Sequence, residues 1–210
     1  QRDGPLALHE ILRIGMQTAA GLAAAHAQGL VHRDIKPANI LLENGVERVK
    51  INDFGLAIAE ADASVSKSGL GAGTPQYMAP EQCVGLPLST RSDLYALGLV
   101  LFELFTGRHA YEATTLDDVR RFHETENVPA PSSILPDIDR SVDRIVLQCL
   151  ERDPNRRPSS ATAIASALPG GDPLAAALAA GETPAPELVT AAGGTDAVSP
   201  VIGLSLVALV

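Results

Sequence analysis

The stretch from Val31 to Leu42 contains three polar side chains whose types suit chemistry on a phosphate group. They are Asp34, Lys36 and Asn39, and apolar runs lie on both sides of them. A carboxylate can accept a hydroxyl proton, an ammonium group can stabilise charge on a transferring group, and an amide oxygen can bind Mg²⁺. The alternative is a solvated turn whose charges pair only with one another, and an isolated His-Arg-Asp triplet would favour that interpretation.

A second motif favours the catalytic interpretation. The triplet Asp53-Phe54-Gly55 follows the run Val49-Lys50-Ile51, so that another carboxylate lies at the end of a predicted strand. Between the two motifs lies Asn44-Gly45, and Asn-Gly between apolar runs is a strong signal for a β-hairpin. Because a hairpin brings its two outer ends together, Asn39 and Asp53 are predicted to reach the same metal ion.

The remaining elements are predicted to be mainly helical. Apolar residues recur at helical spacing over 6–28 and 138–152, a short surface helix is expected over 117–123, and Ser159 is expected to cap a last helix ending at Leu168. Gly29 is expected to end the first helix and to lead into a short strand at 30–31. His9 and His26 are interpreted as ordinary helix residues without a functional role.

The segment 92–106 is apolar on nearly every face, which predicts a helix in the core of the domain. It is too short for a membrane span and is interrupted by Asp93 and Glu103. Asp93 is the informative residue, because a carboxylate that enters a core needs hydrogen-bond partners.

Five motifs in this order resemble the eukaryotic-like serine/threonine protein kinases of bacteria, over roughly residues 6–168. They are His32-Arg33-Asp34 with Lys36 and Asn39, Asp53-Phe54-Gly55, and the segments 73–81, 92–98 and 152–158. The resemblance implies the large C-terminal lobe of the protein-kinase α+β fold, which is mainly α. Short β-hairpins are expected around the catalytic loop, which lies in the stretch from Val31 to Leu42. The kinase domain is expected to comprise residues 1–168.

The resemblance also implies roles for individual residues. Asp34 would be the base, Lys36 would contact ATP and stabilise the transferred group, and Asn39 and Asp53 would hold the Mg²⁺ of ATP. Thr74 would form a hydrogen bond toward Asp34 and Lys36. Structural or regulatory roles are implied for His32, Arg33, Phe54, Gly55, Glu81, Asp93 and Arg157. Within this group Glu81 is expected to pair with Arg157, and Asp93 is expected to accept hydrogen bonds from the backbone of the catalytic loop.

Residues 56–72 correspond to the activation segment, which phosphorylation can order through arginine, here Arg33. Candidate phosphate acceptors are Ser64, Ser66, Ser68 and Thr74, although the serines also fit the polar composition of a linker. Ile58 stands where many relatives have a basic residue, so that this loop offers fewer cationic partners. Thr74 and Lys36 favour serine or threonine over tyrosine as the acceptor in the protein substrate.

The composition excludes some classes of protein. The net charge of −9 argues against a nucleic-acid partner, and the two cysteines lack the spacing of a zinc site and fit a reducing cytoplasm as buried thiols. Residues 169–199 are rich in Pro, Gly and Ala and are interpreted as a linker. We interpret 200–210 as the start of a truncated transmembrane helix that anchors a cytoplasmic catalytic domain. The alternative is an apolar terminal strand or a disordered end, and no Lys or Arg flanks the stretch on its N-terminal side.

A complete kinase also has a small lobe with a glycine-rich loop, a strand lysine and a helix glutamate, and none of these motifs is found in the 210 residues. We therefore expect a fragment, inactive alone, of a kinase that transfers the ATP γ-phosphoryl group to Ser or Thr. The alternative is a non-catalytic pseudokinase or a lobe-only interaction module. The full set Asp34, Lys36, Asn39 and Asp53 favours the first hypothesis, and the missing lobe favours the second for these residues.

Overall fold

The structure is a computed structural model that describes residues 6–43, 45, 48–54 and 75–171. Its α-helices are α1 (Leu8–Ala27), α3 (Pro80–Cys83), α4 (Thr90–Thr106), α5 (Leu116–Thr125), α6 (Arg140–Cys149) and α7 (Ala161–Ala167). Its strands are β1 (Ile40–Glu43) and β2 (Arg48–Ile51), and the short 3-10 helices are η1 (Pro37–Asn39), η2 (Pro75–Tyr77), η3 (Pro131–Ser133) and η4 (Pro154–Arg156). The described part is thus mostly helical with one two-stranded sheet, as predicted.

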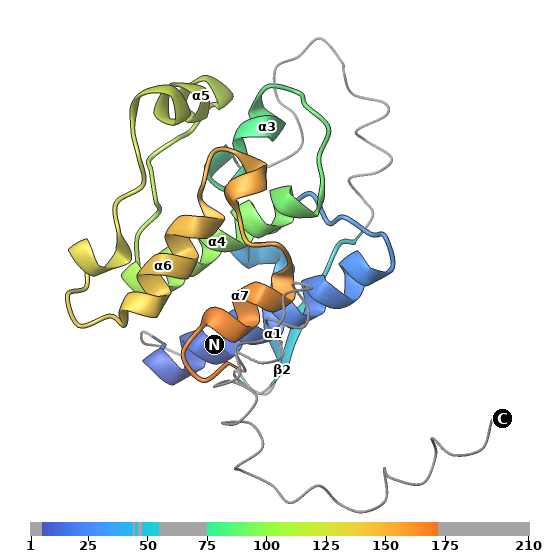
Figure 1. The fold of residues 1–210 in the computed structure, drawn as a ribbon, viewed down its shortest axis with the longest axis vertical. Coiled ribbons are helices and arrows are strands. Elements are labelled where there is room, and N and C mark those ends of the chain that lie inside the picture. Colours follow the sequence, from blue (N-terminus) through green and yellow to red (C-terminus); the bar gives the residue numbers. More distant parts are fainter. Residues whose placement is uncertain (1–5, 44, 46–47, 55–74, 172–210) are drawn as a thin grey trace, which may run out of the picture.

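Helix α4 runs through the middle of the lobe, with α1 and α6 packed against it (Figure 1). Its residues 92–102 are all buried, which confirms the prediction of a core helix. The helix begins two residues earlier than predicted, because the Ser89 side chain accepts a hydrogen bond from the Arg91 N–H and caps the helix there. It ends at Gly107, whose φ of 67° is the left-handed conformation that glycine adopts readily.

Helix α1 packs against α4, α7 and β2, with Ile14 and Leu22 on its buried face. Gly29 follows the helix with a φ of 74°, which confirms the predicted stop. The prediction of a strand at 30–31 is wrong, because the backbone N–H groups that come next, of His32 and Arg33, donate to a side chain of α4 and not to a neighbouring strand.

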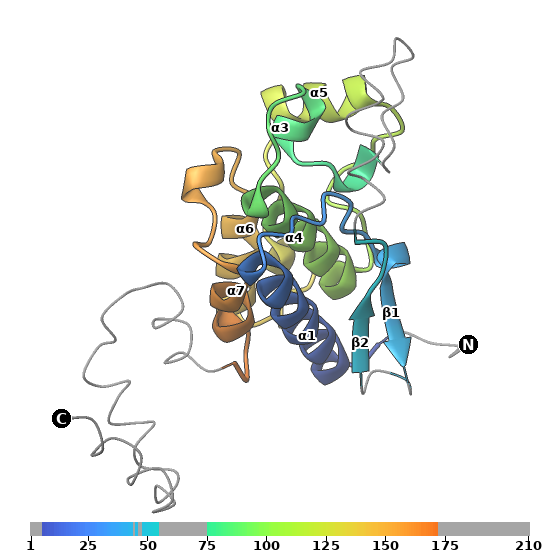
Figure 2. The same cartoon turned by 90° about the vertical axis from the view of Figure 1, so that its right-hand side faces the viewer.

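Strands β1 and β2 form the predicted antiparallel hairpin, with Ile40 opposite Ile51 and Glu43 opposite Arg48. The hairpin lies beside α1, on the side of the lobe away from α6 and α7 (Figure 2). Its outer ends therefore meet at the catalytic loop, which is the arrangement that the Asn-Gly turn predicted.

Helices α5, α6 and α7 differ in their bounds from the prediction. Helix α5 begins after its cap Thr115 and extends to Thr125, two residues past the predicted end. Helix α6 begins two residues later than predicted, because Asp139 caps it, and it ends earlier, at Cys149. Helix α7 is capped by Ser160, which accepts a hydrogen bond from the Ala163 N–H, and not by Ser159 as predicted. Each cap uses an oxygen that satisfies free N–H groups of the first turn.

Several predictions fall outside the described residues. They concern Gly55, Thr74, the activation segment 56–72 with its serines, nearly all of the 169–199 linker, and the apolar end at 200–210. Within the described ranges, no helix combines the length and the apolar character that crossing a membrane requires.

Gly98 allows α4 and α6 to approach closely. A Cβ atom added at this position would lie 2.6 Å from the Cβ of Cys149 and 3.1 Å from the Cδ2 of Leu150. We expect Gly98→Ala to lower the free energy of unfolding by about 1–3 kcal/mol through overpacking, although alanine is the better helix former. Urea denaturation would measure this change.

The matched control is Gly21→Ala in α1, where the added atom meets only the side chain of Ile51, at 3.1 Å. Because that side chain can move, we expect this variant to be as stable as the wild type or slightly more stable. Equal stability of the Gly98 variant and the wild type would show that the α4–α6 contact is not tight.

Candidate active site

The three polar side chains of the catalytic loop form one connected group around Asp34. The Lys36 Nζ lies 2.7 Å from Asp34 Oδ2. The Asn39 amide Nδ2 donates to the backbone oxygen of Asp34 at 2.8 Å and to its Oδ2 at 3.1 Å. The short helix η1, with Pro37 at its first position, turns the chain so that Asn39 points back at Asp34. The Asp34 carboxylate is 30% exposed and can therefore be reached by a substrate.

Asp53 follows the last residue of β2 by two positions, and its neighbour Asn52 pairs with Asn39. The Asn52 N–H donates to the Asn39 carbonyl at 2.9 Å, which continues the hairpin pairing by one residue and places Asp53 directly after it. Asp53 is exposed and has a φ of 63°. This left-handed conformation is uncommon for residues other than glycine and turns the chain sharply after the strand.

Asn39 and Asp53 offer oxygen atoms of the chemical type that Mg²⁺ prefers. Asn39 is 5% exposed and uses its Nδ2 toward Asp34, so that its Oδ1 is the atom left to act as a ligand. An amide oxygen and a carboxylate are hard ligands of the kind that Mg²⁺ prefers. The described residues contain no cluster of three or more His, Cys, Asp or Glu that could hold a metal.

Asp93 in α4 holds the backbone of the catalytic loop. It is 1% exposed, and its Oδ1 accepts the Arg33 N–H at 2.7 Å while its Oδ2 accepts the His32 N–H at 2.8 Å. The same Oδ2 lies 2.8 Å from the Nε2 of His26 at the end of α1. Arg33 has a φ of 71°, an uncommon conformation that costs roughly 1–3 kcal/mol, and the bonds to Asp93 offset this cost.

The contact of His26 with Asp93 was not predicted from the sequence. It is separated from Asp93 by 67 positions, and nothing in the helical spacing of 6–28 distinguishes it from the exposed His9. Only the path of the chain brings it to the carboxylate. The sequence did indicate that a buried Asp93 needs several hydrogen-bond donors. The only donors predicted for it were backbone N–H groups of the catalytic loop.

His32 connects the catalytic loop to the loop after β2. Its Nδ1 accepts a hydrogen bond from the Asp34 N–H at 3.3 Å, so the ring proton is on Nε2, which donates to the Asn52 carbonyl at 2.7 Å. Its ring also meets that of Phe54 edge to face, with 4.6 Å between centroids. One fully buried side chain therefore fixes the spacing between Asp34 and Asp53.

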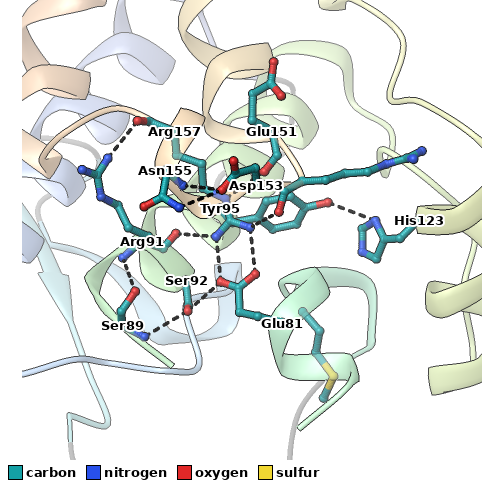
Figure 3. Close-up of polar contacts among 12 residues, drawn as sticks. Glu81, Ser89, Arg91, Ser92, Tyr95, His123, Glu151, Asp153, Asn155 and Arg157 are labelled. Carbon is teal, nitrogen blue, oxygen red and sulfur yellow. Dashed lines mark hydrogen bonds and ion pairs between the residues drawn. The ribbon is translucent and has the colours of Figure 1, made fainter. Parts of the chain in front are cut away.

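Glu81 and Arg157 form the contact that was expected from the sequence (Figure 3). The Arg157 Nη1 and Nη2 donate to Glu81 Oε1 and Oε2 at 2.7 Å and 2.8 Å, and the Ser92 hydroxyl donates to Oε1 at 2.8 Å. Burial raises the pKa of Glu81, but the hydrogen bonds from Arg157, from the Glu81 backbone and from Ser92 outweigh it, and the pKa lies below its ordinary value. Removing one partner of such a buried pair typically costs about 3–5 kcal/mol.

Further side chains around this pair were not anticipated. Arg91 donates to the carbonyl oxygens of Arg157 and Pro158, and the Arg157 guanidinium lies over the ring of Tyr95, 4.7 Å from its centroid. The Tyr95 hydroxyl in turn lies 3.5 Å from Nδ1 of His123 on α5 (Figure 3). The ion pair is thereby connected to α5, which places three helices around one buried charge pair.

Both thiols are buried, as the composition predicted. Burial raises the pKa of Cys83 to about 11, which keeps this thiol protonated at neutral pH. We therefore assign no chemical role to Cys83, whose thiol is in the unreactive form.

A comparison with known protein families identifies the family of this chain. The family model described as "Protein kinase domain" matches residues 1–168. The chain belongs to the protein kinase family.

Its relatives are bacterial serine/threonine-protein kinases. The chain is 37% identical over 180 residues to serine/threonine-protein kinase pkn3 of Myxococcus xanthus, covering 81% of this chain and 33% of that protein. It is 39% identical over 168 residues to Pkn1 of the same organism, covering 78% of this chain and 24% of that protein. The chain thus spans between about a quarter and a third of the length of these relatives.

Solved kinase domains share the fold. A crystal structure of the Mycobacterium tuberculosis PknI kinase domain, in a double mutant, superposes with a TM-score of 0.60 at 28% identity. The match covers 80% of this chain and 57% of that one. The described elements are therefore part of a kinase fold, namely the helical lobe with the hairpin that carries the catalytic loop.

His123 should make the stability depend on pH. Burial lowers its pKa from 6.5 to about 4, and the nearby Arg152 guanidinium acts in the same direction. Between these pH values the unfolded chain binds a proton that the folded protein does not, so stability falls as the pH decreases. We expect the free energy of unfolding to be about 1–2 kcal/mol lower at pH 5 than at pH 7.5 on this account.

This difference should largely disappear in His123→Phe, which keeps a ring among the aromatic neighbours Tyr95, Tyr111 and Phe122. The matched control is His9→Phe, because His9 is exposed and this change should leave the pH dependence as it is. Urea denaturation at the two pH values measures both. An unchanged pH dependence in His123→Phe would show that the buried imidazole is not its source.

Proposed function

We propose that the protein carrying this chain is a serine/threonine protein kinase that transfers the γ-phosphoryl group of ATP to Ser or Thr hydroxyls of proteins. The observation that carries the proposal is the connected group of Asp34, Lys36 and Asn39, with Asp53 at its side and Asp93 beneath it. The names of the relatives support the same reaction and the same acceptor type.

Each side chain has a task that its contacts suit. Asp34 would accept the proton of the attacking hydroxyl, because its carboxylate is partly exposed while its backbone is held. Lys36 already lies against that carboxylate and would stabilise negative charge on the group in transfer. The Asn39 amide keeps Asp34 in one orientation, which reduces the ordering needed in the transition state.

The family uses ATP with a divalent metal ion, and we infer Mg²⁺ held through Asn39 Oδ1 and the Asp53 carboxylate. Bound there, the ion would neutralise charge on the phosphates of ATP. Thr74 would complete the acceptor site beside Asp34 and Lys36. The apolar residues 200–210 would anchor the catalytic domain at the cytoplasmic face of a membrane.

A lobe-only interaction module is the second candidate. Its support is that α3 is held in a fixed position by the pair of Glu81 with Arg157 and by the Arg120 hydrogen bonds to the Cys83 carbonyl, as a binding surface requires. Such a module would bind partners through the surface around α3 and α5 without transferring phosphate. The two hypotheses differ in whether the side chains of Asp34, Lys36 and Asn39 are needed for the function of the protein.

Replacing the base should abolish phosphoryl transfer. In the complete protein, we expect Asp34→Asn to lower the turnover rate about 10²–10⁴-fold, because the amide cannot accept the hydroxyl proton. The fold should be retained, since the Asp34 backbone contacts do not depend on the carboxylate. The matched control is Asp117→Asn, because that side chain is 89% exposed, on α5. Full activity of Asp34→Asn would mean that the base is another group.

Mg²⁺-dependent ATP binding tests the second half of the site. By calorimetry, we expect Mg²⁺·ATP to bind and Asp53→Ala to abolish the binding, whereas Asp137→Ala at an exposed position should not. If the 210-residue chain alone fails to bind, the measurement is repeated on the complete protein. Binding that survives Asp53→Ala there would contradict the metal assignment.

A further inference from the structure

The backbone of Arg33 is held at both of its polar groups. Its N–H donates to Asp93 Oδ1 at 2.7 Å, and its carbonyl oxygen accepts a hydrogen bond from Gln82 Nε2 at 3.3 Å. Arg33 has the left-handed φ of 71° and directly precedes Asp34. The backbone conformation of Arg33 therefore sets the direction of the chain at Asp34.

The two anchors come from different parts of the lobe. Asp93 belongs to the core helix α4, whereas Gln82 belongs to α3, which has four residues and is too short to be stable as an isolated helix. Helix α3 follows η2 after two residues and includes Glu81, the last residue of the motif 73–81. Gln82 thus connects α3 to the catalytic loop.

Helix α3 is nevertheless firmly placed, because both neighbours of Gln82 are tied to other helices. Glu81 is paired with Arg157, and the Cys83 carbonyl accepts two hydrogen bonds from the Arg120 guanidinium of α5, at 2.9 Å and 2.6 Å. A side chain between two fixed neighbours can impose a position on a loop. Gln82 is half-buried, so this hydrogen bond is partly shielded from water.

We propose that Gln82 is a positioning residue for the base: through the Arg33 carbonyl it couples the placement of α3 to the orientation of Asp34. The proposal rests on the proposed kinase function and goes beyond it. Only a donor can serve here, because the partner is a carbonyl oxygen. A glutamate of the same shape would place a carboxylate against that oxygen and would repel it.

The first test measures the effect of the hydrogen bond from Gln82 to the Arg33 carbonyl on the catalytic loop and requires no enzymatic activity. Gln82→Met keeps the length of the side chain and removes the donor. In the 210-residue chain, we expect amide hydrogen exchange of His32 and Arg33 to become about five- to tenfold faster, the loss expected for one hydrogen bond, while the α4 amides stay protected. The matched control is Gln148→Met at an exposed position of α6, which should leave these rates unchanged.

The second test measures the consequence for the reaction in the complete protein. We expect Gln82→Met and Gln82→Glu to lower kcat about five- to tenfold or more, with the KM for ATP and the thermal unfolding midpoint unchanged. A merely structural role would lower the midpoint instead. The control Gln148→Met should match the wild type in all three quantities.

The outcomes separate this proposal from the proposed function. Faster exchange together with the selective loss of kcat supports it. Unchanged exchange in Gln82→Met overturns it, and so does faster exchange with an unchanged kcat. A wild-type protein without any phosphoryl transfer would refute the proposed function and, with it, the catalytic part of this proposal, whereas the exchange rates would still decide whether Gln82 holds the loop.

Discussion

The structure depends on one buried carboxylate, that of Asp93. A charge removed from water costs several kcal/mol unless donors surround it, and here the donors are two backbone N–H groups of the catalytic loop and the ring of His26. Satisfying Asp93 and shaping the loop are therefore the same event. The left-handed backbone of Arg33 persists because releasing it would remove the hydrogen bond that the buried Oδ1 of Asp93 accepts.

The same physical device recurs at Glu81. Its pairing with Arg157 holds α3 in place, because this segment has few apolar side chains of its own. The ring of Tyr95 lies under the Arg157 guanidinium, and its hydroxyl contacts His123 on α5. The lobe thus uses apolar packing for its long helices and buried charge for its short functional segments. The buried charges of Asp93, Glu81 and Arg157 all have hydrogen-bond partners, as this division requires.

The sequence predicted those features that depend on neighbouring residues. The Asn-Gly turn indicated the hairpin, and the all-round apolar pattern indicated α4. The contact between Glu81 and Arg157, which are 76 positions apart, was expected only from the resemblance to protein kinases. The sequence did not predict the role of His26 or the contacts of Gln82, because both follow from the path of the chain and leave no periodic signal. The caps at Ser160 and Asp139 were missed for a related reason, since several nearby polar residues could each have ended the helix.

The position of Asp93 on the most buried helix has a consequence for control. Asp93 ties the backbone of His32 and Arg33 to the most buried helix of the lobe, so a displacement of that backbone would break hydrogen bonds to the core. Within the described residues, the carbonyl side of Arg33 is held only by the half-buried Gln82 of the short helix α3. A change in the placement of α3 is therefore a smaller perturbation than a change in α4, and regulation of the proposed base would act more readily from that side.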